Sequence, residues 1–383
     1  MTMWFVIIGL AIFFTLIYCV LILFYYTWFK QLKYFKPDET LKPATCFSVI
    51  IPARNEEENI ERCVSSILQN DYPENLYEVI VVDDFSDDAT AVTIKKMQKH
   101  FSNLRLIELK NFVEPKLNSY KKKSIETAIL NSSYEWIVTT DADCVVSKHW
   151  LKLFDNFIQT NDPVFIAAPV RFFNNNSFIS IFQCLDFLSL QGITAASVSA
   201  GFLSMCNGAN LSYKKEAFNA VNGFKGVDNI ASGDDMLLMN KIQHPFPNKI
   251  GYLFNKEIIV TTPPMPDVKR FINQRIRWAS KATSYSDKKI FLVLLLVYIF
   301  NFCLFTLPFI AIFDHQLFYY WLAFLVLKTG CEFIFLFPVA KFFDQRKLLW
   351  WFPLMQPFHI VYTVVSGFLG KFGKYEWKGR TVK

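Results

Sequence analysis

Two aspartates, Asp141 and Asp143, directly follow the apolar run 137–139. A buried run that stops at Asp-x-Asp indicates a strand whose carboxyl end carries both acids, which is where open α/β sheets bind ligands. Because side chains at i and i+2 of a strand point the same way, both carboxylates can face one Mg²⁺ or Mn²⁺ ion. Such an ion keeps coordination positions for substrate phosphates. The alternative is a strand end closed by Asx turns, and the motif alone leaves both interpretations open.

A second pair of acids, Asp83 and Asp84, follows the apolar run 79–82. In a parallel sheet the two strand ends lie at the same edge, so the four acids are expected to converge on one crevice. Neighbouring carboxylates repel one another, and a divalent metal or a basic ligand is therefore the expected partner. The alternative is a set of unrelated helix N-caps.

The segments around these acids indicate an α/β fold. Strand-like and helical patterns alternate, which predicts βαβ units and a Rossmann-like, mostly parallel sheet. The predicted strands cover 47–51, 78–82, 104–109 and 137–140, and the predicted helices cover 57–68, 89–100 and 121–131. The first strand is not followed by G-x-G-x-x-G, and the chain contains no G-x-x-x-x-G-K-[ST], so phosphates would be held by metal and side chains.

Apolar residues, 52% of the 383 positions, are concentrated at 4–26 and 290–369. The segment 44–284 between them predicts one globular domain of about 240 residues, long enough to bury a core. The formal charge of +7 comes from Lys and Arg that cluster beside the apolar runs. This placement favours an anionic membrane surface over nucleic acid as a partner. The eight cysteines have no C-x-x-C spacing, which predicts reduced thiols and no zinc site.

Residues 1–28 are predicted to form an N-terminal transmembrane anchor, because the apolar run 3–26 is long enough to cross a bilayer. A basic start, a short apolar core and a small-residue cleavage site would indicate a signal peptide, and their absence predicts an uncleaved anchor. Lys30, Lys33 and Lys36 follow the run, so the globular domain is expected on the cytoplasmic side.

Residues 290–370 are predicted to form two or three further spans, followed by a basic tail at 371–383. A full third crossing would place the basic tail outside, against the positive-inside rule, so the number of spans is left open. Lys328 and Glu332 are four residues apart in one span and are expected to pair inside the bundle, with a role in acceptor passage as the alternative. The segment 177–203 fits either an amphipathic helix on the membrane or a core helix.

Several motifs occur in order along 44–284. They are S-V-I-I-P-A-R-N-E-E from Ser48, V-V-D-D-F-S-D-D from Val81, T-D-A-D from Thr140, N-G-A-N-L-S-Y from Asn207, G-D-D from Gly233 and Q-R-I-R-W from Gln274. Together they resemble the inverting glycosyltransferases of family 2, which have the GT-A fold. The last motif resembles the Q-x-x-R-W motif of membrane-embedded members such as polysaccharide synthases and ceramide glucosyltransferases.

The resemblance implies a donor site for a UDP-sugar. Its residues would be Pro52, Arg54, Glu56, Asp83, Asp84, Lys122, Lys123, Asp141 and Asn210. Pro52 and Arg54 would line the base pocket, and Asp84 would contact uracil or ribose. Asp141 would hold ribose or metal, and Asp143 would hold the metal that bridges the diphosphate. Lys122 or Lys123 occupies the place of a family lysine near the nucleotide, and the glycine that precedes it in the family is Lys121 here.

The resemblance also assigns catalysis to Asp235, with Asp234 in the place of the family's Glu. An acceptor hydroxyl must lose its proton as it attacks the anomeric carbon, and a carboxylate near apolar residues can take that proton. The alternative is that the two acids cap the helix predicted at 235–243, and both roles are compatible.

Gln274, Arg277 and Trp278 are spaced at i, i+3 and i+4, so a helix would place them on one face. Trp offers a plate for stacking a sugar, and Arg offers a fork for a diphosphate. The alternative is an interfacial helix anchored at the headgroups by these two residue types.

The sequence thus predicts a membrane-bound inverting glycosyltransferase that uses a UDP-sugar and Mg²⁺ or Mn²⁺, with a lipid or polysaccharide acceptor at the cytoplasmic membrane face. A processive polysaccharide synthase subunit is the close alternative. A non-catalytic nucleotide-sugar-binding subunit and a transporter are alternatives of other classes, and the oligomeric state is left open.

Overall fold

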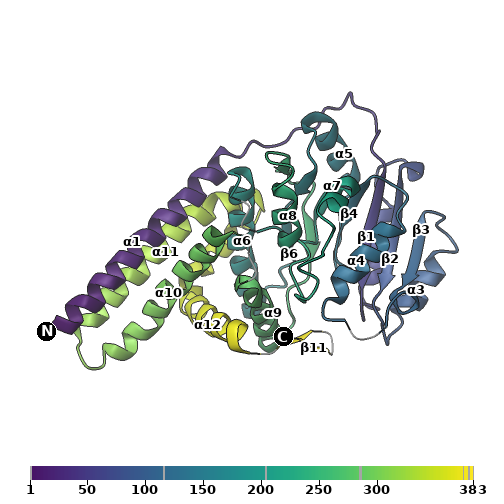
Figure 1. Ribbon diagram of the computed structural model, residues 1–383. Helices are drawn as coiled ribbons and strands as arrows, with labels where there is room; N and C mark the ends of the chain where they lie inside the picture. Colours follow the sequence, from purple (N-terminus) through teal and green to yellow (C-terminus); the bar gives the residue numbers. More distant parts are fainter. Residues whose placement is uncertain are drawn as a thin grey trace.

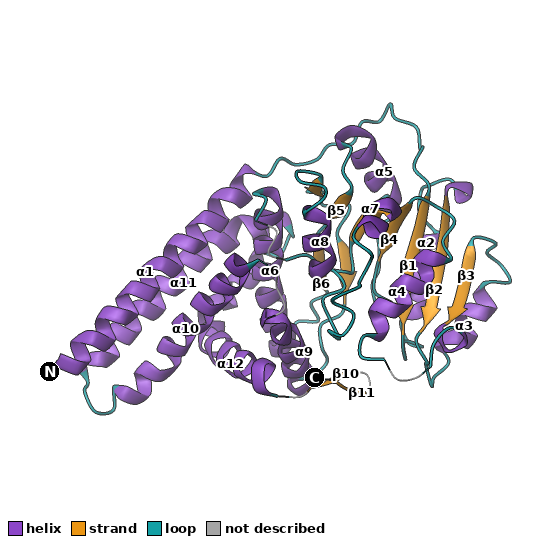
Figure 2. Cartoon of the chain, viewed as in Figure 1, coloured by secondary structure: helices purple, strands orange, loops and turns teal. Residues whose placement is uncertain are grey.

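The computed structural model describes residues 2–114, 117–202, 205–283, 287–373, 375–377 and 380–382. The strands of the main sheet gather at one side of the molecule, and the long helices extend from the other side (Figure 1, Figure 2). Figure 1 shows α1 (Thr2–Gln31) and α11 (Gln316–Phe342) side by side, although they come from opposite ends of the chain.

The main sheet has seven strands in the order β3-β2-β1-β4-β7-β5-β8. Strands β3, β2, β1 and β4 run parallel to one another, while β7 is antiparallel to both of its neighbours, β4 and β5. The bounds are β1 Phe47–Ala53, β2 Tyr77–Asp83, β3 Leu104–Glu108, β4 Trp136–Thr139, β5 Phe165–Ala167, β7 Leu211–Lys214 and β8 Ile250–Tyr252. The predicted mostly parallel α/β sheet is confirmed, and the antiparallel β7 makes it a mixed sheet.

Shorter elements complete the globular part. A two-stranded parallel sheet joins β6 (Val170–Phe172) to β9 (Val260–Thr262), and an antiparallel pair joins β10 (Tyr375–Trp377) to β11 (Arg380–Val382). The helices are α2 Ile60–Leu68, α3 Thr90–Met97, α4 Tyr120–Leu130, α5 Trp150–Asn161, α7 Lys215–Ala220, α8 Met236–Gln243 and α9 Val268–Ala279. Within the predicted basic tail, Lys374, Lys378 and Lys383 lie outside the described residues.

Five helices in the described ranges are long and apolar enough to cross a membrane. They are α1, α6 (Phe178–Ser199), α10 (Lys288–Ile310), α11 and α12 (Phe352–Phe372, preceded by a 3-10 turn at Arg346–Trp351). Helix α6 differs from the other four because 72% of its apolar window is buried inside the protein. It packs against α1, α11 and β6, so the segment predicted as either a surface or a core helix is a core helix.

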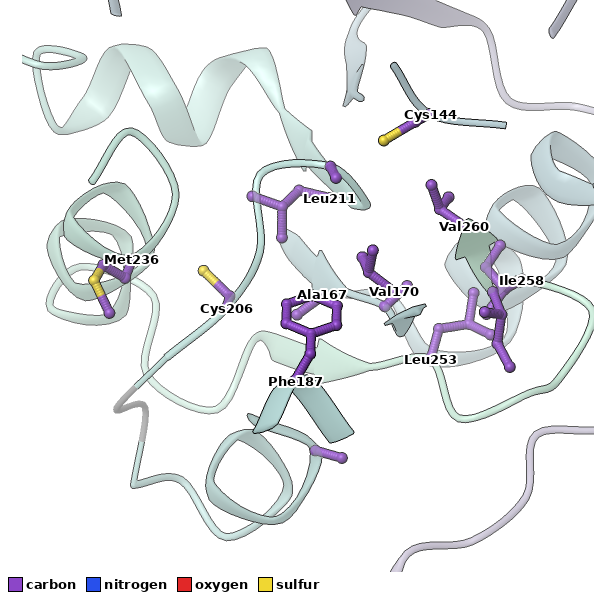
Figure 3. Packing of buried hydrophobic residues seen from close by; sticks show 14 of the residues in the cluster. Cys144, Ala167, Val170, Phe187, Cys206, Leu211, Met236, Leu253, Ile258 and Val260 are labelled. Carbon is purple, nitrogen blue, oxygen red and sulfur yellow. The ribbon is translucent and has the colours of Figure 1, made fainter. Parts of the chain in front are cut away.

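One buried cluster extends from the sheet into the long helices. Phe187 of α6 stacks on Phe172 of β6 with ring centroids 4.1 Å apart. Figure 3 shows Phe187 among side chains contributed by several other elements, including Val170 and Leu211. Shared burial of this kind is what fixes the sheet relative to the helices.

The predicted pair of Lys328 and Glu332 is confirmed, with Nζ 2.8 Å from Oε1. Gln356 of α12 bonds to both members, donating to Glu332 and accepting from Lys328, and Tyr18 of α1 donates to the Glu332 carboxylate. Three helices are therefore joined by one buried polar network, which is the arrangement expected for charges among apolar spans.

A close approach between α6 and α11 depends on Gly192. A Cβ atom added there would lie 2.6 Å from Val339 Cγ2 and 2.8 Å from Phe335 Cζ. We expect Gly192→Ala to lower the free energy of unfolding by about 1–3 kcal/mol, because overpacking forces the two helices apart. Thermal unfolding of the purified full chain measures this. Gly330→Ala on α11 is the matched control, since nothing lies within 4 Å of its added Cβ, and equal effects of both changes would contradict the expectation.

Candidate active site

A cavity of about 800 Å³ lies between the carboxyl edge of the sheet and the long helices. Acids from three distant segments, represented by Asp84, Asp143 and Asp235, all line it. The sequence-predicted residues that line it are Pro52, Arg54, Glu56, Asp84, Asp141, Asp143, Asp234, Asp235, Gln274, Arg277 and Trp278. The parallel order β2-β1-β4 explains why Asp84 and Asp143 meet, because these strands end at the same edge, and Asp235 joins them from the start of α8.

Arg54 ties together the loops that follow β1 and β2. Its Nη1 donates to the carbonyl oxygens of Asp84 at 2.8 Å and Phe85 at 2.6 Å. Two residues of these loops, Asn55 with φ 49° and Phe85 with φ 52°, have left-handed backbone conformations. Such a conformation is costly for Phe, so the loop shape is held by its contacts. The two loops therefore form one preorganised wall of the cavity.

Lys121, at the start of α4, bridges two of the acids. Its Nζ lies 2.7 Å from Asp141 Oδ1 and 3.1 Å from Asp234 Oδ2. Burial alone would lower the pKa of Lys121, but the two carboxylates outweigh burial and raise that pKa. Burial likewise opposes ionisation of Asp234, and Lys121 overcomes it and lowers the pKa of the Asp234 carboxyl. Lys121 and Asp234 thus stabilise each other's charged forms.

Gly208 allows this close approach. A Cβ at this position would lie 3.1 Å from Asp234 Oδ2 and 3.4 Å from Lys121 Nζ. The loop containing it is fixed from both sides, since its carbonyl oxygen accepts from Thr139 Oγ1 at 2.9 Å and its N–H donates to Asp235 Oδ2 at 3.2 Å. A side chain here would crowd the ion bridge.

Asp141 and Asp143 offer the oxygen ligands that a hard divalent cation prefers. Asp143 Oδ1 also accepts from Thr262 Oγ1 at 3.2 Å, which orients that carboxylate. No group of three or more His, Cys, Asp or Glu side chains within the described ranges is arranged to hold a metal. Two carboxylates completed by substrate phosphates and water remain a chemically suitable set for Mg²⁺ or Mn²⁺.

Asp235 is both the N-cap of α8 and a wall of the cavity. Its Oδ1 accepts from the N–H of Met236 at 2.7 Å, and its Oδ2 accepts from the N–H of Gly208. Each carboxylate oxygen has two lone pairs, so a further hydrogen can still be accepted. The two interpretations of this acid, helix cap and proton acceptor, are therefore compatible in the geometry.

Helix α9 carries Gln274, Arg277 and Trp278 on the face that lines the cavity. Arg275 of the same helix is buried between rings, with its Cζ 4.5 Å from the Phe271 centroid and 4.3 Å from the Trp278 centroid. This guanidinium donates through Nε to Asp186 Oδ2 at 2.9 Å and through Nη1 to Gln274 Oε1 at 2.5 Å. Cation–π contacts and a carboxylate thus hold the two predicted site residues in place.

Asp186 connects this helix to the long helices. It lies on α6, accepts two hydrogen bonds from Arg275, and accepts a third from the Tyr362 hydroxyl of α12. The side chains of both Asp186 and Arg275 are almost fully buried, at 2% and 4% exposed. Three helices from different parts of the chain therefore meet at one ion pair behind Trp278.

Four predicted donor-site residues do not line the cavity. Lys122 donates to the carbonyl oxygens of Val227 and Ile230, and burial lowers its pKa to about 8. Lys123 pairs with Glu126 at 3.5 Å instead. The cavity position expected for one of these two lysines is filled by Lys121, because residue 121 is on the inner face of α4.

Asp83 and Asn210 are the other two predicted donor-site residues that do not line the cavity. Asp83 is the last residue of β2 and is 4% exposed; burial raises the pKa of its carboxyl. Asn210 is fully buried and donates to the carbonyl oxygens of Pro169 and Ile258 while accepting from Trp150 Nε1 at 2.9 Å. Through these contacts Asn210 joins the main sheet to the two-stranded sheet of β6 and β9.

The long helices contribute a mostly apolar part of the cavity lining. Side chains of α10, α11 and α12 in it include Ile290, Phe291, Leu294, Leu295, Phe335, Phe352, Met355, Phe368 and Phe372, together with the polar Glu332, Gln356, His359 and Lys371. Phe291, Leu295, Phe368 and Phe372 are exposed at the surface, so the cavity wall continues onto the outer face of the long helices. One continuous space therefore joins a charged end and an apolar end.

Sequence reasoning missed Lys121, Asp186 and Arg275. Helical periodicity over 120–130 does not single out Lys121, since Lys121 and Lys122 lie four and three residues before the buried Ile125 and are both on its side of the helix. An acid in the middle of an apolar helix, as at Asp186, is a signal for a buried partner. No sequence signal identifies that partner as Arg275.

Residues 48–221 match the protein family described as Glycosyl transferase family 2, and residues 136–369, more than half of the chain, match Glycosyl transferase family group 2. The chain therefore belongs to glycosyltransferase family 2.

Among curated proteins, the chain is similar to a poly-beta-1,6-N-acetyl-D-glucosamine synthase of Staphylococcus epidermidis, with 26% identity over 61% of this chain and 53% of the relative. It is also similar to glycosyltransferase AglE of Haloferax volcanii, with 28% identity over 38% of this chain and 45% of the relative. The chain spans about half the length of the curated relatives it matches.

Among solved structures, the chain resembles a mannosyltransferase of Pyrobaculum calidifontis in complex with GDP-Man and Mn²⁺. The TM-score is 0.59 at 17% identity, and the match covers 94% of this chain and 99% of that one. At this identity the similarity shows a shared fold. That shared fold is the GT-A arrangement predicted from the motifs.

The buried Asp186–Arg275 pair predicts a large effect of removing one partner. We expect Asp186→Asn to lower the free energy of unfolding by about 3–5 kcal/mol, because Arg275 is left buried without a counter-charge. The thermal unfolding temperature of the full chain reports the change. Asp344→Asn is the matched control, since Asp344 is an exposed partner of Lys256 and a surface pair contributes about 1 kcal/mol or less. A similar shift in both variants would contradict the expectation.

Proposed function

We propose that the protein is a membrane-bound, nucleotide-sugar-dependent glycosyltransferase that transfers a sugar with inversion to a membrane-borne acceptor. The observation that carries this proposal is the single cavity that joins the acids of the sheet edge to the apolar side chains of the long helices. Family membership supports glycosyl transfer as the reaction, and the cavity is where the donor and the acceptor would meet. The long apolar helices support attachment to a membrane.

The donor is a nucleoside diphosphate sugar, with UDP as the nucleotide that the motifs favour. Pro52, Arg54, Glu56 and Asp84 form the wall that would hold the base and ribose. Asp141 and Asp143 would hold Mg²⁺ or Mn²⁺, and such an ion supplies a positive charge that stabilises the departing nucleoside diphosphate. The similar mannosyltransferase is in complex with GDP-Man, so GDP-sugars belong in the same screen.

The transfer is a single displacement. The acceptor oxygen forms a bond to the anomeric carbon as the bond from that carbon to the diphosphate oxygen breaks, and the acceptor proton passes to the Asp235 carboxylate. One displacement inverts the anomeric configuration. Trp278 would present its ring to the sugar, and Arg277 would donate to the diphosphate.

The acceptor is an amphiphile whose hydroxyl reaches Asp235 while its chain lies among Leu294, Phe368 and Phe372. The apolar lining and its continuation onto the surface of α10 and α12 support a lipid that enters from the bilayer. A growing polysaccharide is the second candidate, supported by the similarity to a poly-beta-1,6-N-acetyl-D-glucosamine synthase. The two differ in the product, which is a glycolipid in one case and a polymer in the other.

The reaction is tested with the full chain in membranes, by mass spectrometry of lipid extracts after incubation with UDP-sugars and GDP-sugars. We expect Asp235→Asn to lower the transfer rate by about 10²–10⁴-fold, because the general base is lost while the helix cap is retained. Removal of divalent ions with EDTA is expected to abolish transfer, and Mn²⁺ or Mg²⁺ to restore it. Full activity in both cases would contradict the proposal.

The acceptor branch is tested separately with Leu294→Trp, which places a larger ring in the apolar end of the cavity. We expect transfer to lipid acceptors to fall about tenfold or more, while binding of UDP or GDP is unchanged, because overpacking acts only on the acceptor side. Leu292→Trp is the matched control, since Leu292 is 60% exposed on the same helix and is not part of the lining. Equal transfer to lipid acceptors by the two variants would contradict the proposal that the lipid chain lies beside Leu294.

A further inference from the structure

Lys121 stands at the centre of the charged end of the cavity. It reaches Asp141, which follows β4, and Asp234, which precedes α8, with both contacts within 3.1 Å. The Lys121 side chain is 22% exposed and lines the cavity while it contacts its two partners. A protein cation therefore already neutralises one of the two carboxylates that would hold a metal ion.

Lys121 and a divalent ion would compete for the same carboxylate, Asp141. A divalent ion bound by Asp141 and Asp143 needs the Asp141 oxygens that Lys121 now contacts, and it repels the ammonium at short range. A nucleoside diphosphate brings negative charge into the same space and offers the ammonium new oxygen partners. Asp234 would retain a counter-charge after Lys121 turned away, because Lys281 lines the same cavity and also lowers the pKa of Asp234, after the larger effects of burial and Lys121.

We propose, resting on the function proposed above, that Lys121 binds the diphosphate of the donor and that its bridge between Asp141 and Asp234 makes divalent-ion binding depend on the donor. In the donor-free protein Lys121 acts as the internal cation of the site. When the donor binds, the ammonium moves to the diphosphate and releases Asp141 to the metal. Donor and metal binding are thereby coupled through one side chain.

The test measures binding, separately from turnover. The full chain in detergent or nanodiscs is titrated with Mn²⁺, followed by electron paramagnetic resonance, with and without UDP or GDP. Lys121→Met is expected to bind Mn²⁺ about tenfold more tightly without nucleotide, and the factor by which nucleotide tightens Mn²⁺ binding is expected to fall about tenfold. Nucleotide binding at saturating Mn²⁺ is expected to weaken by the same factor.

Two variants serve as controls. Lys121→Arg retains the charge and is expected to keep the coupling. Lys123→Met removes a lysine that pairs with Glu126 and does not line the cavity, and it is expected to bind both ligands as the unchanged protein does. If Lys121→Met does not fold, Lys121→Gln, which retains a polar end group, is measured in the same way.

The coupling factor separates the outcomes. A lysine that acts only through its distant charge changes Mn²⁺ affinity equally with and without nucleotide, so an unchanged coupling factor in Lys121→Met overturns this inference alone. Failure of the unchanged protein to bind both Mn²⁺ and either nucleotide overturns the inference together with the proposed function.

Discussion

Repulsion among carboxylates at one edge of the sheet is the constraint on which the rest of the site depends. The parallel strands β2 and β4 are followed at the same sheet edge by Asp84, Asp141 and Asp143, and the segment that begins α8 adds Asp234 and Asp235. Such an assembly is stable only with positive charge among the acids. Lys121 provides that charge within the protein, and Gly208 leaves the room for it.

A second ion pair compensates buried charge at a point away from Lys121 and the sheet edge. Arg275 and Asp186 join α9 to α6, and the Tyr362 hydroxyl adds α12 to the same point. Because Trp278 packs directly on the Arg275 guanidinium, its ring is positioned by a contact that also involves the long helices. The position of Trp278 in the cavity and the packing of the helices are therefore not independent.

Much of this could be predicted from sequence, for identifiable reasons. Buried strands that end in acids have a strong pattern, so the sheet edge with Asp84, Asp141 and Asp143 was predictable. The face of α4 was not, because three consecutive lysines resemble one another until packing selects Lys121. The contacts of Asn210 were not predictable, because a motif residue that joins two sheets looks the same in sequence as one that contacts substrate. The antiparallel β7 depends on pairing between distant segments, which local patterns do not contain.

The long helices form one wall of the cavity, so the cavity is complete only in the full chain. A fragment trimmed to the sheet domain for solubility would lose one wall of the site, so its ligand preferences would not represent those of the whole chain. Alkyl glycoside detergents combine a hydroxylated head with an apolar tail, which are the two chemistries that the ends of this cavity offer. The choice of solubilising agent is therefore part of any assay, because such an agent is itself a candidate occupant.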